Sequence, residues 1–260
     1  MSQPMRPYFL PISRLAEQPY SQILGYPKAS RTQIRSRISE LRALKVDGVA
    51  FVGPMLIGKT YVLGKGYTGI VVLAKLGGRK VALKIRRTDS PRKSMADETA
   101  FLVAANKVNV GPKMIASSRN FLVMEFLDGI KIHDWVGQIH GRKAVKQLKS
   151  ILRKILLDCQ KLDGIGLDHG ELSYISKHVI VGKKTTIIDF ESSSLERRAS
   201  NVTSAAQGLY IGSGLAKIIQ KTCPVPPKNK IIAALREYKR NQTRESFENI
   251  LGVLKIRNAT

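Results

Sequence analysis

The sequence contains few residues of several types, and each shortage excludes a class of protein. Two cysteines, Cys159 and Cys223, are too few for a disulfide framework and indicate a reducing compartment. No apolar run reaches the length of about 18 residues that a membrane-spanning helix needs. Met1 is followed by no charged-then-apolar leader pattern. We therefore expect a cytoplasmic protein with no membrane partner.

Acidic residues are also scarce, with 19 Asp and Glu against 44 Lys and Arg, which gives a net charge of +25 over 260 residues. Because 43% of the residues are hydrophobic, the chain is not a disordered basic tail, and its length suits one large domain or two small ones. The sequence has no zinc-finger spacing and no aromatic-rich RNP pattern. The charge alone predicts a polyanionic partner, such as RNA, a ribonucleoprotein or an acidic protein.

Residues 1–54 have the character of an N-terminal extension. The first thirty are interrupted by prolines and predict an extended, irregular arm with room for one short helix. A helix is expected from Thr32, with an apolar face formed by Ile34, Ile38, Leu41 and Leu44. Arg35, Arg37 and Arg42 lie mostly off that face, and Asp47-Gly48 is expected to end the helix. The extension either packs on the next domain or forms a winged-helix-like nucleic-acid module.

The remaining chain changes from strands to helices. Residues 55–127 predict a five-stranded antiparallel sheet with strands at 61–63, 70–74, 81–85, 113–116 and 121–126. Gly77-Gly78 signals a hairpin, and a helix is expected over 92–107. Residues 128–260 predict mainly helices, at 145–162, 202–220 and 230–254, with short strands at 178–181 and 186–188. The fold class is therefore α+β.

A glycine-rich turn lies between the first two of these strands. Residues 64–71 fit the pattern GxGxxGxV, in which glycines let the backbone approach a triphosphate closely. A strand rather than a helix follows the turn, which argues against a Rossmann site. Taken alone the pattern is weak, because glycine-rich hairpins are common.

A lysine and a glutamate follow the glycine turn in the order that is typical of a protein-kinase nucleotide site. Lys84 lies on the third strand, where a protein kinase keeps the lysine that holds the nucleotide phosphates. Glu98 lies on the following helix and is well placed to pair with Lys84. Either residue alone would be an ordinary solvated side chain, but the order and spacing predict a nucleotide site.

With these motifs, the chain resembles the small atypical protein kinases and is most similar to the RIO kinases and the kinase subunit of the KEOPS tRNA-modification complex. The resemblance covers roughly residues 55–220. It implies a two-lobed protein-kinase-like fold, with residues 55–127 as the N-lobe and residues 128–260 as a compact helical C-lobe. It also implies ATP as substrate, with Mg²⁺ or alternatively Mn²⁺.

The resemblance assigns the residues that would contact the nucleotide. Met124 would guard the back of the adenine pocket, and the Glu125 carbonyl and Leu127 amide would meet the adenine edge. Ile180 would form the floor under the adenine, although a plain core strand accounts for the residues around Met124 equally well. The implied nucleotide-binding set is Gly64, Lys65, Gly66, Gly69, Val71, Ala82, Lys84, Glu98, Met124, Glu125, Leu127 and Ile180.

The sequence His169-Gly170-Glu171 follows the long helix, where the RIO and KEOPS kinases have His-Gly-Asp. By this resemblance Glu171 would orient the substrate hydroxyl or accept its proton, provided that it is recessed by about one methylene. Asp168 is a weaker candidate for the same role.

The metal-binding positions also depart from the kinase pattern. The segment that starts at Asp189 reads Asp-Phe-Glu in place of Asp-Phe-Gly, and Asp189 would hold Mg²⁺. Alignment on the following strand puts His178 in the place of the metal-binding asparagine, whereas counting from Glu171 gives Ser176. Because Mg²⁺ prefers oxygen ligands, a structural histidine is an equal alternative at position 178.

The resemblance implies a serine/threonine protein kinase, which could also phosphorylate itself, with Lys84, Glu171 and Asp189 as catalytic residues. The sequence lacks an Ala-Pro-Glu motif and a long activation loop. Arg197 and Arg198 are expected to contact an acidic substrate or partner.

Three other functions are alternatives to this one. The altered positions at Glu171 and His178 leave open an ATP-binding switch or ATPase that remodels a ribonucleoprotein. A small-molecule kinase of the aminoglycoside type would need an acidic substrate pocket. The shortage of acidic residues argues against this function. A purely nucleic-acid-binding protein leaves the ordered motifs unexplained.

Overall fold

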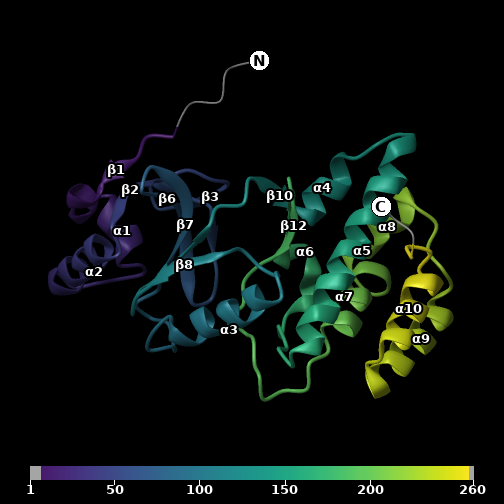
Figure 1. Ribbon diagram of the computed structural model, residues 1–260. Coiled ribbons are helices and arrows are strands. Elements are labelled where there is room, and N and C mark those ends of the chain that lie inside the picture. The colour runs from purple at the N-terminus through teal and green to yellow at the C-terminus, as the bar shows by residue number, and fades with distance from the viewer. Residues whose placement is uncertain (1–6, 258–260) are drawn as a thin grey trace. The chain divides into compact units, whose positions relative to one another are not determined.

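The computed structural model describes residues 7–257 and divides the chain into two units (Figure 1). Unit 1 contains the chain up to Val103 together with Pro112–Leu127, and unit 2 contains Ala104–Gly111 and the chain from Asp128 onward. The α+β fold class expected from the sequence is confirmed, since unit 1 is built on an antiparallel sheet and unit 2 mainly on helices.

The main sheet lies in unit 1 and differs from the expected one. Among the described residues it has seven strands, and six of them form a continuous path with β5 paired to β6. In order across the sheet the path is β1 (Leu10–Pro11), β2 (Val46–Ala50), β6 (Gly69–Leu76), β7 (Arg79–Arg86), β9 (Phe121–Glu125) and β8 (Met114–Ser117), with β5 at Gly64–Lys65.

The strand expected at residues 61–63 is not part of this sheet, so that prediction was wrong. It corresponds to β4 (Thr60–Val62), which pairs with β3 (Met55–Ile57) in a separate hairpin. The edge of β6 is taken instead by β2 and β5. The Gly77-Gly78 hairpin is confirmed: both glycines have positive φ, +55° and +77°, as a two-residue turn between twisted strands requires.

The N-terminal segment packs on one face of this sheet. It contains a 3₁₀ helix η1 (Ile12–Ala16), α1 (Tyr20–Leu24) and α2 (Arg31–Ala43). Their apolar side chains share a buried cluster with residues of β6, β7 and β9. The expected irregular arm with one short helix was therefore wrong in part within the described residues, which hold two short helical pieces before residue 30 and pack on the sheet. Prolines interrupt regular structure without preventing burial of the apolar side chains between them. Residues 1–6 lie outside the described chain.

Helix α2 begins and ends through local backbone chemistry. The Ser30 hydroxyl accepts from the Gln33 amide at 3.2 Å, and the Gln33 side chain accepts from the Ser30 amide at 2.8 Å, which completes a capping box. The helix ends before Lys45, whose φ is +57°. Asp47-Gly48 therefore does not end the helix, as the sequence suggested, but lies within β2.

A buried polar network fixes α2 on the sheet. Arg37, expected on the polar side of the helix, is only 3% exposed and donates to the Leu24 carbonyl at 2.5 Å. Asn120, which precedes β9, donates to the carboxylate of Glu40 at 2.5 Å and accepts from Arg86 at 2.9 Å. Such contacts to charged groups offset the cost of burying them. They favour the packing interpretation of the N-terminal extension over a free nucleic-acid module.

Unit 2 is built around one long helix. Helix α5 (Arg142–Gly164) replaces the shorter helix expected at 145–162. Most of its apolar face is fully buried, namely Leu148, Leu152, Ile155, Leu156, Cys159 and Leu162. A small sheet is formed by β10 (Gly129–Lys131), β11 (Val179–Gly182) and β12 (Thr185–Ile187). Short helical pieces precede β11, namely η2 (Leu172–Tyr174) and α6 (Ile175–His178), and α4 (Ile132–Gln138) follows β10.

The helices expected at 202–220 and 230–254 are each divided in two. The first consists of α7 (Asn201–Tyr210) and α8 (Gly214–Thr222), and the second of α9 (Lys228–Asn241) and α10 (Arg244–Val253). Ser213 and Thr243 cap α8 and α10 by accepting backbone N–H bonds at 3.0 and 3.2 Å. Apolar periodicity continues across both breaks, which is why the sequence pattern did not reveal them. In unit 1, α3 (Ala96–Lys107) is the helix expected at 92–107, and it continues into unit 2.

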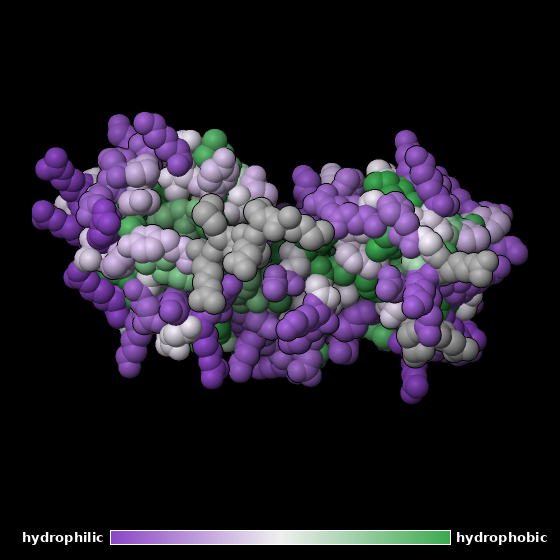
Figure 2. Space-filling model, turned by 90° about the horizontal axis from the view of Figure 1, so that it is seen from above, coloured by the Kyte–Doolittle hydropathy of each residue, from purple (hydrophilic) through white to green (hydrophobic). Residues whose placement is uncertain are grey.

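No helix formed by residues 7–257 combines the length and the apolar character needed to cross a membrane. Figure 2 shows one face of the molecule, on which hydrophilic side chains predominate and hydrophobic areas are small.

Candidate functional site

Unit 1 contains a buried ion pair at the expected position. Lys84 on β7 and Glu98 on α3 meet with 2.7 Å between Nζ and Oε1, and their side chains are only 4% and 5% exposed. Moving two charges out of water costs several kcal/mol per ion, and the attraction between them offsets this only with good geometry. Because such a pair is costly to bury, its position in unit 1 is a candidate functional site.

The strand register places four of the expected nucleotide contacts on one face of the sheet. Val71 on β6 is directly opposite Lys84, and Ala82 on β7 is directly opposite Met124 on β9. Directly opposite residues, and residues two apart on one strand, point to the same face. We call this the Lys84 face. The intervening residues point to the other face, which the N-terminal segment covers.

Two glycines of the GxGxxGxV turn differ in what surrounds them. A Cβ added to Gly69 would lie 3.0 Å from both Cγ and Cε of Lys84, whereas one added to Gly64 would have no atom within 4 Å. The Gly66 amide donates to the Gly69 carbonyl at 2.8 Å and closes the turn. Gly69 therefore leaves room for the Lys84 side chain, which the pattern alone did not show.

The glycine turn is attached to the N-terminal segment by an aromatic residue that sequence reasoning missed. The Lys65 ammonium donates to the Tyr26 hydroxyl at 2.7 Å and lies 4.7 Å from the centre of the Tyr26 ring. Arg87 lies 5.3 Å from the same ring centre and donates to the Gly66 carbonyl at 3.3 Å. Tyr26 occurs among prolines, without any pattern that would single it out.

The two expected adenine-edge residues lie at the end of unit 1. The Glu125 amide donates to the Lys113 carbonyl at 2.8 Å, and the Glu125 carboxylate accepts from the Lys113 amide at 3.2 Å. Leu127 lies just beyond the end of β9. Ile180, the proposed adenine floor, belongs to β11 in unit 2, where it is paired with Lys131 on one side and Thr186 on the other.

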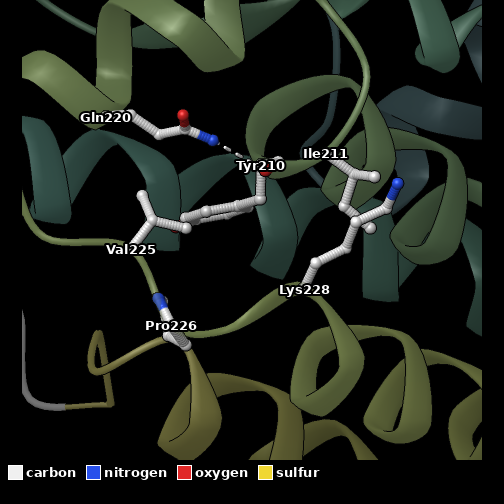
Figure 3. A pocket seen from close by; sticks show the side chains of 6 residues that line it. All are labelled: Tyr210, Ile211, Gln220, Val225, Pro226 and Lys228. Carbon is white, nitrogen blue, oxygen red and sulfur yellow. Dashed lines mark hydrogen bonds between the residues drawn. The ribbon is translucent and has the colours of Figure 1, made fainter.

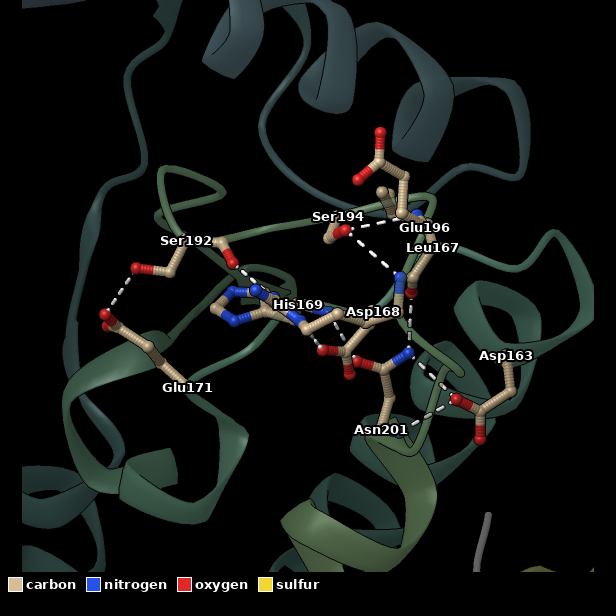
Figure 4. Close-up of polar contacts among 10 residues, drawn as sticks. Asp163, Leu167, Asp168, His169, Glu171, Ser192, Ser194, Glu196 and Asn201 are labelled. Carbon is tan, nitrogen blue, oxygen red and sulfur yellow. Dashed lines mark hydrogen bonds and ion pairs between the residues drawn. The ribbon is translucent and has the colours of Figure 1, made fainter. Parts of the chain in front are cut away.

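In unit 2, both carboxylate oxygens of Glu171 have partners. The Ser192 hydroxyl donates to Oε1 at 2.6 Å, as Figure 4 shows, and Nε2 of His178 lies 3.1 Å from Oε2. The Glu171 side chain is 35% exposed. Sequence reasoning identified Glu171 and His178 separately, but neither their contact nor the role of Ser192.

The contact between His178 and Glu171 is best described as a hydrogen bond from a neutral imidazole. Burial lowers the pKa of His178 below its usual value, although the charges of Asp189 and Glu171 act in the opposite direction. The Glu171 contact then assigns the proton to Nε2, and the buried Nδ1 has no hydrogen-bond partner among the described residues. His178 ends α6 rather than beginning a strand, and Ser176, the other proposed metal ligand, lies on the same short helix.

His169 supports the loop that carries Glu171. Its Nε2 lies 3.0 Å from the Ile188 carbonyl. Its amide donates to the Asn201 side chain at 2.8 Å, as Figure 4 shows. Burial, assisted by the nearby His178, lowers the pKa of His169 to about 4. The ring is therefore neutral at physiological pH and acts as a donor to the backbone.

Gly170 leaves space for an arginine from a later segment. Its φ is +86°, and an added Cβ would lie 2.5 Å from the Ser192 carbonyl oxygen and 2.7 Å from Nη2 of Arg197. Arg197 donates to the Asp168 carboxylate at 2.9 Å and to the Ser192 carbonyl at 2.5 Å. Asp168 is therefore engaged with Arg197, which favours Glu171 as the candidate base.

The expectation that Arg197 and Arg198 contact an acidic partner is not supported by their bonds. Arg197 is engaged as described above, and Arg198 donates to the carbonyl groups of Lys239 and Arg240 at the end of α9. Cations in this place satisfy the last carbonyls of a helix. Both arginines hold unit 2 together.

Asp189 adopts an unusual backbone conformation after β12, with φ of +72°. A residue with a side chain in this region is strained by about 1–2 kcal/mol, and such strain is concentrated at functional sites. The charge of Asp189 also reaches Lys131 on β10: burial lowers the pKa of Lys131, and Asp189 opposes that shift. Lys131 was not identified from the sequence.

No group of three or more His, Cys, Asp or Glu side chains within the described chain could hold a metal ion. A carboxylate such as Asp189 can nevertheless bind Mg²⁺ when substrate phosphates and water supply the remaining oxygens. The residues present fit that type of site and do not fit a metal centre enclosed by protein ligands.

A cavity of about 420 Å³ lies elsewhere in unit 2 (Figure 3). It is lined by Tyr210, Ile211, Gln220, Val225, Pro226 and Lys228. None of the residues identified from the sequence lines it, and the Gln220 side chain reaches the Tyr210 carbonyl at 3.4 Å across it.

Comparison with known proteins gives one informative relative and no family model that matches. Over 98 residues the chain is 32% identical to the uncharacterized protein MJ1211 of Methanocaldococcus jannaschii. The matched region is 38% of this chain and 81% of that protein.

Proposed function

For this chain, which belongs to the same family as the uncharacterized protein MJ1211 of Methanocaldococcus jannaschii, we propose an ATP- and Mg²⁺-dependent phosphotransferase that acts on serine or threonine hydroxyls. The name of that relative states no activity, so the proposal rests on the residues of this chain. It includes a two-lobed protein-kinase-like fold of the RIO and KEOPS type, in which unit 1 is the N-lobe and unit 2 the C-lobe.

One observation carries the proposal: the buried pair of Lys84 and Glu98 on the Lys84 face. A structural role alone would be served as well by apolar residues, because replacing a buried ion pair by packed apolar side chains is often neutral or stabilising. A lysine held in place by a glutamate is suited to neutralise the charge of transferred phosphates. The adjacent Val71, Ala82 and Met124 would supply an apolar surface for the adenine ring of ATP.

Unit 2 would supply the remaining groups. Glu171 would orient the acceptor hydroxyl and take its proton, and Asp189 would hold Mg²⁺ together with phosphate oxygens. His178 would act on Glu171 rather than as a metal ligand, because its Nε2 is directed to that carboxylate. Mg²⁺ would neutralise charge that develops on the phosphates.

The test is transfer of phosphate from ATP labelled at the γ position to the chain itself or to dephosphorylated casein. Asp189→Asn and the double variant Lys84→Met/Glu98→Leu should each lower the rate at least about 100-fold. The first weakens the binding of Mg²⁺, and the second removes the ammonium that neutralises phosphate charge. The double variant avoids leaving Glu98 buried without its partner.

Matched controls exist for both variants. Lys80→Met changes an exposed lysine on the same strand as Lys84, and Asp134→Asn changes a carboxylate that is 61% exposed. Both controls should keep wild-type transfer. Transfer that survives Asp189→Asn and the double variant would show that the site assignment is wrong.

A second candidate is an ATP-binding switch or ATPase that remodels a ribonucleoprotein. It is favoured by the engagement of both Glu171 oxygens, since Ser192 and His178 occupy the positions that an external acceptor would use. Steady release of phosphate from ATP without labelled protein, increased by added RNA, would support it over the first proposal.

We also retain as proposals a cytoplasmic location and a partner with negative charge, either an acidic protein substrate or RNA in a ribonucleoprotein. Both cysteines are free and buried, in keeping with a reducing compartment. The net charge of +25 supports the polyanionic partner, and binding to RNA should then weaken steeply with salt.

A further inference from the structure

Three consecutive serines after the Asp-Phe-Glu segment have three different environments. The Ser192 hydroxyl donates to Glu171 at 2.6 Å. The Ser193 hydroxyl is buried with no hydrogen-bond partner among the described residues, and the Ser194 hydroxyl accepts from the amides of Glu196 and Arg197 at 3.1 and 3.2 Å. One of three identical side chains thus makes contact with the candidate base.

We propose that Ser192 is a phosphorylation site that the chain modifies in itself, with its hydroxyl held as the acceptor by Glu171. This inference rests on the proposed phosphotransferase function. A general base must lie within hydrogen-bond reach of the proton that it takes, and the distance between Ser192 Oγ and Glu171 Oε1 meets this requirement. The contact from His178 to the other oxygen of Glu171 fixes the direction of the carboxylate.

The reaction is an ordinary transfer from a nucleoside triphosphate. The Ser192 oxygen forms a bond to the terminal phosphorus while the bond between that phosphorus and the bridging oxygen breaks. The hydroxyl proton goes to Glu171, and the nucleoside diphosphate leaves with the bonding electrons. No oxidant or reductant is required.

The surroundings of Ser192 also indicate how a phosphate on this residue would be stabilised and how it would affect Glu171. Nη2 of Arg197 lies 2.5 Å from the Ser192 carbonyl oxygen, so its guanidinium is near enough to pair with a phosphate on the same residue. A phosphate beside Glu171 would also repel that carboxylate and remove the contact seen here. Modification of Ser192 would therefore release Glu171 and change its access to other acceptors.

The experiment uses the full chain with Mg²⁺ and ATP, followed by intact-mass measurement and fragmentation of the tryptic peptide 185–197, which contains all three serines. One phosphoryl group should appear at Ser192, at a rate that does not change with protein concentration, because acceptor and base belong to one chain. Ser192→Ala should lower this incorporation about 100-fold or more, and Ser192→Thr should retain it. Ser193→Ala is the matched control and should behave as wild type.

Casein added to the same reactions separates the two proposals. Casein labelling without phosphate at Ser192 would overturn this inference and leave the proposed function standing, with Ser192 then a positioning residue for Glu171. Incorporation that rises with chain concentration, or that is equal at Ser193 and Ser194, would also overturn it. Labelling of neither casein nor the chain would overturn the proposed function itself, and this inference with it.

Discussion

The candidate residues of unit 1 and unit 2 are held by different forces. In unit 1, Lys84 and Glu98 are both charged, almost fully buried and paired directly. In unit 2, the side chain of Glu171 is 35% exposed, and its carboxylate accepts hydrogen bonds from Ser192 and His178. Burial lowers the pKa of His178, so its imidazole is neutral when it donates this bond.

This difference teaches which group is fixed and which can exchange its partners. A buried charge that loses its partner has no water to replace it, so the Lys84–Glu98 pair stays in one arrangement. A half-exposed carboxylate can give up one hydrogen bond for another at a net cost of about 1 kcal/mol. Glu171 can therefore exchange Ser192 for another hydroxyl, while Lys84 keeps its position.

The largest effect is expected from breaking the unit 1 pair. Lys84→Met leaves Glu98 buried without its cation and should lower the free energy of unfolding by about 3–5 kcal/mol in urea titrations. Adding Glu98→Leu should recover most of the loss. Lys80→Met, on the same strand but exposed, should stay within about 0.5 kcal/mol of wild type. Equal losses for Lys84→Met and Lys80→Met would contradict the role given to buried charge.

The second effect concerns the neutral histidines of unit 2. Because the pKa of His169 is about 4 in the folded chain, the unfolded chain binds an additional proton at this residue between pH 6.5 and 4. Stability should therefore fall as the pH is lowered through that range, by at most roughly 3 kcal/mol from this residue. His169→Gln should flatten the dependence in urea titrations between pH 7 and 4.5. An unchanged pH dependence in this variant would show that His169 does not cause the loss of stability at low pH.

A third, smaller effect tests the close packing around Glu171. Gly170→Ala combines a strained φ of +86° with a Cβ 2.5 Å from the Ser192 carbonyl oxygen, and should cost about 2–3 kcal/mol. Gly166→Ala is the control, because its φ is +70° but no atom lies within 4 Å of the added Cβ. It should cost about 1 kcal/mol from strain alone. If thermal unfolding gives equal losses, the crowding at Gly170 is not important.

The smallest effect tests the corresponding space in unit 1. Gly69→Ala places a methyl group 3.0 Å from two carbons of Lys84 and should cost about 1–2 kcal/mol, as overpacking does. Gly64→Ala meets no atom within 4 Å and should stay within about 0.5 kcal/mol. The comparison is made by thermal unfolding of both variants. A larger loss for Gly64→Ala would show that Gly69 does not make room for Lys84.

The order of local elements explains what could be predicted from the sequence. Lys84 and Glu98 lie on a strand and on the next helix, and their pairing follows from that order. The contacts of Glu171 could not be predicted, because Ser192 reaches it through a turn that follows Asp189, and its two neighbouring serines are identical in sequence. Spacing identifies residue types, whereas the direction of a hydroxyl depends on the tertiary turn.

The N-terminal segment shows a second limit. Its prolines suggested an irregular arm, and the pattern at residues 61–63 suggested the first strand of the main sheet. Which segment pairs with β6 depends on competition among strands for the same edge, and β2 occupies that edge through Val49 and Ala50. Local propensity does not decide such competition.

The attachment of the glycine turn to Tyr26 has a consequence for the apparent affinity for a ligand. A turn that moves away from Tyr26 gives up the hydrogen bond and the cation–ring contact of Lys65, which together cost about 1–2 kcal/mol. At that cost, only about one molecule in 5 to 30 would have the turn displaced at any time. A ligand that requires displacement would bind more weakly by the same factor, and Tyr26, remote in sequence from every motif, would set its dissociation constant.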